Sequence, residues 1–205
     1  MKANPFNTAA AVRNSNLHVM VNGRLTLCDS NAKVDPAVEQ LHRAFRDFVA
    51  RPDFPCLDAK AAFHDEAYGF AVYHKLASLD STDGLCRDLV HFQQRLIANR
   101  QYTTFISIFL EPIDTNEIEF ENLLWQQLRM LHRLDAVFFE WAPEVGYDPN
   151  DPHFSLSFAG HAFYVIGMHP NSSRAARRFP WPALVFNPPP PGGNEFDCQA
   201  HRLLG

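Results

Sequence analysis

Hydrophobic residues recur along the chain at two spacings, and these spacings predict both helices and strands. Residues 37–50, directly after Pro36, carry apolar side chains three and four positions apart, at Val38, Leu41, Phe45 and Phe48. This spacing is typical of a helix with one buried face, and a proline is well tolerated at its first position. Two prolines then precede a second helical pattern, so Cys56 is expected in or beside the first turn of a helix that includes residues 59–63.

The middle of the chain alternates between strand and helix patterns. Residues 68–74 alternate as a strand does, and residues 102–112 form the strongest strand pattern in the chain. Residues 82–100 and residues 114–135 have helical spacing. The second of these helices opens with capping residues and early glutamates and keeps one apolar stripe, at Phe120, Leu124, Leu128 and Leu131.

The last third predicts a proline-rich loop at 141–153 and strands at 154–158, 161–168 and 182–187, with a hairpin at Ala159-Gly160. Residues 1–31 are small and polar and are expected to be mobile or loosely docked, and residues 188–205 form an irregular tail. The irregular order of helices and strands indicates one α+β domain over residues 1–205, with a mixed or antiparallel sheet packed against several helices.

Composition narrows the possible partners. The formal net charge is −5 and the pI is about 6.0, so nucleic acid is not an expected partner. The four cysteines lie far apart, without a C-x-x-C pair, and are expected to be reduced thiols. With neither a signal peptide nor a membrane-spanning run, the sequence predicts a cytoplasmic protein without membrane contact, in which a homo-oligomer is possible.

Candidate chemistry concentrates in residues 165–179, where an apolar run ends in His169-Pro170. The proline restricts His169 to an extended geometry, so its imidazole is expected on a stiff corner. Asn171 or Ser172 is expected to cap a helical turn. The spacing of Arg174, Arg177 and Arg178 then predicts three cations on one helical face, suited to carboxylates or phosphates.

A stiff imidazole beside a cluster of cations matches what haem requires, an axial nitrogen for iron and positive charge for the propionates. Aromatic residues make up 13% of the chain and are candidates for the walls of such a pocket: Phe109, Trp125, Trp141, Phe158 and Phe163. The alternative from chemistry alone is that the arginines pair with acidic residues and that His169 binds only backbone groups.

Three stretches resemble the YqcI/YcgG family: residues 54–63, residues 123–135 and the block from Asp148 to Asn187 that contains "GMHPNSSRAARRFPWPALVFN". The family includes haem-dependent N-hydroxylases that act on guanidino or amino nitrogens, as in arginine hydroxylation and in guanitoxin biosynthesis. The resemblance covers residues 54–187. After Asn187 this chain departs from the family pattern, in which a histidine-containing stretch and a longer C-terminal segment follow.

The resemblance implies a set of site residues. The H-P-x-S-S-R-x-A-R-R-F block of the family falls on His169, Pro170, Ser172, Ser173, Arg174, Arg177, Arg178 and Phe179 of this chain. The F-P-C block falls on Phe54, Pro55 and Cys56, with Lys60 after it. Ser172 and the three arginines are expected to anchor haem propionates or a substrate carboxylate.

His169 is the expected axial ligand, with His132 and Cys56 as second choices and with His153 and His161 as further alternatives. A thiol at a helix start has a lowered pKa, and a thiolate ligand favours oxygen cleavage. The acidic candidates to receive a guanidinium group are Asp135, Glu140, Asp148 and Asp151.

The leading hypothesis is a haem-dependent N-monooxygenase. It would bind haem b, use dioxygen and an external electron donor, either a protein or a small reductant, and hydroxylate a nitrogen of a small guanidino or amino substrate such as arginine. A non-catalytic haem-binding or sensor protein is the alternative, and a haem-free interaction domain is a third hypothesis.

Overall fold

A central sheet of seven strands organises the computed structural model, which describes residues 3–30, 32–94, 104–148 and 154–189. The strand order is β2-β1-β3-β4-β7-β6-β5. Strands β3 and β4 are parallel, and every other pair is antiparallel. The strands are β1 (His18–Val21), β2 (Arg24–Leu27), β3 (Tyr68–Lys75), β4 (Thr104–Glu111), β5 (Leu156–Phe158), β6 (His161–Met168) and β7 (Ala183–Asn187).

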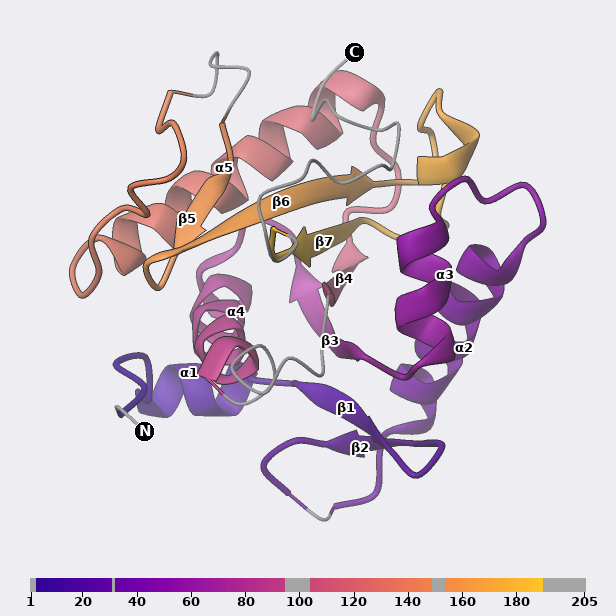
Figure 1. The fold of residues 1–205 in the computed structure, drawn as a ribbon, viewed down its shortest axis with the longest axis horizontal. Coiled ribbons are helices and arrows are strands. Elements are labelled where there is room, and N and C mark those ends of the chain that lie inside the picture. The colour runs from indigo at the N-terminus through magenta and orange to yellow at the C-terminus, as the bar shows by residue number, and fades with distance from the viewer. Residues whose placement is uncertain (1–2, 31, 95–103, 149–153, 190–205) are drawn as a thin grey trace.

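Helices cover both faces of this sheet (Figure 1). The helices are α1 (Ala9–Asn14), α2 (Pro36–Ala50), α3 (Leu57–His64), α4 (Leu79–Phe92) and α5 (Glu117–Asp135). Side chains of α4 and α5 pack on one face with Tyr73 and Phe109, whereas α2 and α3 pack on the other with Phe70 and Ile108. Neighbouring strand residues thus enter opposite cores, and the predicted α+β fold with a mixed sheet is confirmed.

The helices begin where local chemistry satisfies their free N–H groups. The Asp35 carboxylate accepts from the N–H of Ala37 at the start of α2, and the Cys56 sulfur accepts from the N–H of Ala59 at the start of α3. Asn116 and Glu119 form a reciprocal capping box at the start of α5. The predicted helix starts after Asp35, beside Cys56 and near residue 114 are confirmed, and so is the buried face of α2.

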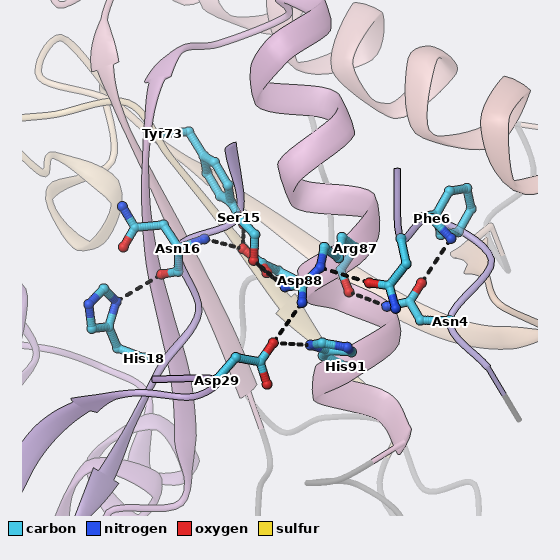
Figure 2. Close-up of polar contacts among 11 residues, drawn as sticks. Asn4, Phe6, Ser15, Asn16, His18, Asp29, Tyr73, Arg87, Asp88 and His91 are labelled. Carbon is cyan, nitrogen blue, oxygen red and sulfur yellow. Dashed lines mark hydrogen bonds and ion pairs between the residues drawn. The ribbon is translucent and has the colours of Figure 1, made fainter. Parts of the chain in front are cut away.

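The first thirty residues correct the expectation of a mobile or loosely docked segment. Residues 3–30 form α1, β1 and β2, and they dock through a polar network onto α4 (Figure 2). The fully buried Asp88 carboxylate accepts from the Asn16 N–H at 2.8 Å, from the Tyr73 hydroxyl at 2.7 Å and from the Ser15 hydroxyl. Arg87 donates to Asp29 at 2.7 Å. The segment is an integral part of the fold.

Two further expectations are resolved at the ends of elements. The hairpin at Ala159-Gly160 is confirmed, with positive φ angles of 52° and 74° that suit a tight turn between β5 and β6. The helix expected at 82–100 instead begins at Leu79 as α4, and its predicted end lies outside the described residues, as do 190–205 of the predicted tail. No helix in the described ranges is long and apolar enough to cross a membrane.

Candidate functional site

His169 directly follows β6, at the sheet edge where the parallel strands β3 and β4 also end. Ligands of open sheets bind most often at such carboxyl ends. The connection from His169 to β7 lies beside the start of α5, near the end of α2 and the start of α3 (Figure 1). Its only helical residues are a 3-10 turn, η2 (Ala175–Arg177). We refer to residues 169–182 as the β6–β7 loop.

The His169 side chain is buried, with 4% of its surface exposed. Its ring lies nearly parallel to that of Phe120 on α5, with centroids 4.5 Å apart and planes 16° apart. Burial lowers the pKa of His169, and the Glu117 charge and the Thr115 carbonyl partly oppose that shift. The imidazole is therefore neutral at pH 7, which is the form that binds a metal.

Three contacts join the β6–β7 loop to the first turn of α5 and to Thr115 just before it. Glu117 accepts from both the N–H and the hydroxyl of Ser173, at 2.9 and 2.7 Å, on the same carboxylate oxygen. Asn171 donates its amide N–H to the Thr115 carbonyl at 2.9 Å. The Phe120 ring supplies the third contact, on His169. The loop that carries the imidazole is thus joined to residues that lie far from it in sequence.

The predicted helical face of arginines is wrong. The turn after His169 is a three-residue 3-10 helix, Arg174 stands at its N-cap, and no side chain caps it. Arg178 folds back and donates to the carbonyls of Ser172 and Ser173 at 2.9 and 3.2 Å, so its guanidinium group supports the loop. Arg174 and Arg177 are half-buried, and burial lowers the pKa of Arg177. Ser172 is buried, and its N–H bonds the His169 carbonyl at 3.3 Å.

The second-choice ligands lie elsewhere. His132 is exposed near the end of α5, against the edge of Trp141, and fifteen residues of helix, about 22 Å, separate it from Glu117 at the other end. Cys56 is disulfide-bonded, so in this form its sulfur offers no thiolate. The expectation of reduced thiols therefore holds for Cys28 and Cys86 but fails for Cys56. His161 is exposed at the start of β6, and His153 lies outside the described residues.

The candidate pocket walls do not meet at His169. Phe109, Phe158 and Phe163 are fully buried in the core between the sheet and helices α4 and α5. Trp125 and Trp141 instead contact Phe154, with ring centroids 5.7 and 6.4 Å from it and tilted ring planes. The aromatic ring that stacks on the imidazole is that of Phe120, which is not one of the five candidates. The predicted set of five aromatic residues is therefore not one cavity wall.

The acidic candidates have separate positions. Asp135 is buried and accepts from the Ala159 N–H at 2.8 Å, so it supports the β5–β6 hairpin. Burial raises the pKa of Asp135 to about 6. Glu140 and Asp148 are exposed, and Asp151 lies outside the described residues. None of these acids contacts His169 among the described contacts.

An open hollow of about 650 Å³ lies beside the start of α5. It is lined by Asp114, Asn116, Glu117, Ile118, Glu119 and Asn171. Two of its carboxylates already hold the backbone, since Glu119 accepts from the Asn116 N–H at 2.9 Å and Glu117 holds Ser173. Hydrogen bonds from Ser173 lower the pKa of Glu117, so this acid is ionised at neutral pH.

The residues at this corner fit the axial ligand that a haem requires. A haem iron needs one nitrogen donor, and a neutral imidazole can supply it through its unprotonated ring nitrogen. Phe120 stacks on a face of the ring, so this contact does not cover the in-plane lone pair of the unprotonated nitrogen. A site of several protein ligands is not found, because no group of three or more His, Cys, Asp or Glu residues gathers within the described ranges.

Sequence reasoning missed Thr115, Glu117 and Phe120 as part of the site. Phe120 was assigned to the apolar stripe of its helix, and Glu117 to its acidic first turn. The contacts that bring Thr115 and Glu117 to the β6–β7 loop each span 56 positions. The spacing of residues within one element cannot predict a contact between residues that are so far apart in sequence.

Comparison with known proteins gives the family. A sequence model of the YqcI/YcgG family matches residues 45–190, which include His169, Ser173 and all of α5. No curated protein and no solved structure matches the chain. The match covers well over half of the 205 residues, and the chain therefore belongs to the YqcI/YcgG family.

Proposed function

We propose that this protein binds haem through His169 and uses it to hydroxylate a nitrogen of a small guanidino or amino compound. The observation that carries the proposal is the buried imidazole of His169, which is neutral and held at the carboxyl edge of the sheet. Membership of the YqcI/YcgG family supports it, because the resemblance extends through the block that contains this histidine.

In this scheme the chain supplies binding and orientation. Arg174 and Arg177 follow five and eight positions after the imidazole, and they would offer positive charge for the propionates. Arg178 would act indirectly, because it already holds the carbonyls of Ser172 and Ser173. A bound haem would supply the activation of dioxygen, with electrons from an external donor.

The substrate class is supported by charge. Glu117 is an exposed, ionised carboxylate at the same corner of the sheet, and the hollow beside it carries two further acids, Asp114 and Glu119. A protonated guanidine or amine is a suitable occupant of such an acidic surface. Arginine and its derivatives are the first compounds to test.

Reconstitution with haemin tests the proposal in two steps. The purified protein is expected to give a Soret band that titrates to one haem per chain. With a chemical reductant and oxygen, it is then expected to consume oxygen and release a hydroxylated product from arginine or a related guanidine. A Soret band without any product would support the non-catalytic haem sensor, and the absence of a band would reject both.

A further inference from the structure

We propose that Glu117 is a positioning residue that holds the His169 imidazole in place by binding Ser173. Both donors of Ser173, its N–H and its hydroxyl, reach one oxygen of the Glu117 carboxylate, at 2.9 and 2.7 Å. Ser173 lies four residues after His169 in the same loop. The contact joins the β6–β7 loop to the first turn of α5. The family match assigns no role to Glu117.

The spacing along α5 explains why this carboxylate acts on the imidazole. Glu117 and Phe120 are three positions apart, so they lie on the same face of the helix. Phe120 restrains the plane of the His169 ring, and Glu117 restrains the backbone that carries the ring. A further hydrogen bond, from the Asn171 amide to the Thr115 carbonyl, joins the loop to the residue that lies just before α5. One helical turn thus fixes both the position and the tilt of the imidazole.

Loss of the Glu117 contact should loosen the loop without unfolding it. The His169 N–H still donates to the Arg177 carbonyl at 3.0 Å, and Arg178 still binds the carbonyls of Ser172 and Ser173. Because Ser173 is exposed, removal of Glu117 leaves its N–H and hydroxyl accessible to water. We therefore expect a change in the orientation of the ligand, with little change in global stability.

Three variants test the proposal: Glu117→Ala, Glu117→Gln and Glu121→Ala. The first removes the acceptor, and the second keeps a neutral acceptor of the same shape. The third removes the same charge one turn further along α5. Two readouts apply to each variant, the affinity for haemin by optical titration and, without haemin, the exchange rate of the Ser173 amide and the ring signals of His169 by NMR.

The proposal predicts about tenfold weaker haemin binding for E117A, as is typical when a residue that orients a metal ligand is removed. It also predicts faster exchange of the Ser173 amide and shifted His169 signals, with E117Q and E121A close to the wild type. Unchanged affinity and exchange in E117A would overturn it. An equal loss in E121A, or no rescue in E117Q, would also overturn it, because either result assigns the effect to charge.

This inference rests on the proposed function only for the haemin readout. If the wild-type protein binds no haemin, the proposed function fails. The NMR readout then still decides whether Glu117 holds the imidazole, because it is measured in the haem-free protein. The two failures are therefore distinguishable.

Discussion

His169 and Asp88 are both buried titratable residues, but they have different surroundings. The His169 ring is neutral and has the Phe120 ring stacked against one face. The Asp88 carboxylate accepts from Ser15, Asn16 and Tyr73 and lies beside Arg87 (Figure 2). The His169 imidazole is the ligand of the proposed function, whereas the fully satisfied carboxylate of Asp88 serves the fold.

Asp88 should make stability depend on pH in a defined direction. Burial raises the pKa of Asp88 from 3.8 to about 6, so the folded state holds a proton that the unfolded state has lost. The stabilisation is complete below pH 3.8 and is lost as the pH rises through about 6. Between these two values, the wild type should lose up to about 1.4 kcal/mol per pH unit relative to Asp88→Asn.

Urea denaturation of the wild type and D88N across this range measures the difference. Burial lowers the pKa of His42 to about 4, and this histidine acts in the opposite direction because the unfolded state gains its proton first. Its contribution is the same in both proteins and cancels in the comparison. Parallel pH profiles for the two proteins would show that Asp88 does not titrate as described.

At the scale of elements, two glycines set how closely helices approach their neighbours. A Cβ at Gly84 on α4 would lie 2.2 Å from the backbone oxygen of Asn14, at the end of α1. A Cβ at Gly167 on β6 would lie 2.5 Å from the Leu124 side chain and 2.7 Å from Phe120. The side chains near Gly167 can rotate to make room for a Cβ, whereas the helix backbone near Gly84 cannot. A Cβ at Gly84 is therefore harder to accommodate.

Gly84→Ala should therefore destabilise the protein more than Gly167→Ala. Overpacking at Gly167 is expected to cost about 1–3 kcal/mol, and the displaced Phe120 ring should also shift the NMR signals of His169. Chemical denaturation of both variants gives the order of their stabilities. A smaller loss for G84A than for G167A would contradict the close packing of α1 on α4.

The elements that sequence predicted are those with enough residues to show a period. Helix α2 spans fifteen residues, and its buried face was read directly from the spacing of Val38, Leu41 and Phe45. Helix α1 spans six residues, and strands β1 and β2 span four each, which is too short for a period to be recognised. The bond between Asn4 and Arg87 that docks this segment joins residues 83 positions apart.

The site was predicted in part for the same reason. His169 follows a recognisable strand and precedes a proline, so its corner position could be read locally and is confirmed. The arginine face assumed a helix, but the chain forms a 3-10 turn of three residues before Phe179 enters the core with α2. Glu117 and Phe120 join the site only through tertiary contacts.

At the scale of the whole molecule, residues 3–30 complete the central sheet, and they lie before residue 45, where the match to the family model begins. Strand β1 pairs with β3 and thereby covers the edge of the parallel pair, while Leu17 and Val19 enter the core beneath α4. Removal of this segment would expose that edge and leave the Asp88 carboxylate without two of its three hydrogen-bond donors.

Deletion of residues 1–30 should therefore prevent cooperative folding or greatly lower the midpoint of thermal unfolding. The expected cost is several kcal/mol, since it combines lost apolar burial with a buried carboxylate that lacks partners. Circular dichroism and near-ultraviolet spectra during a thermal scan measure the effect. A truncated protein that unfolds at the wild-type temperature would show that residues 3–30 are an accessory to the fold.

The most direct test of the central claim is the absorption spectrum of haemin-reconstituted wild type, His169→Ala and His132→Ala. The exposed His132 near the far end of α5 provides the matched control. The account predicts that the wild type and H132A share the same ferric Soret band, and that H169A loses or shifts this band and regains it with added imidazole. An H169A spectrum identical to that of the wild type would contradict His169 as the axial ligand.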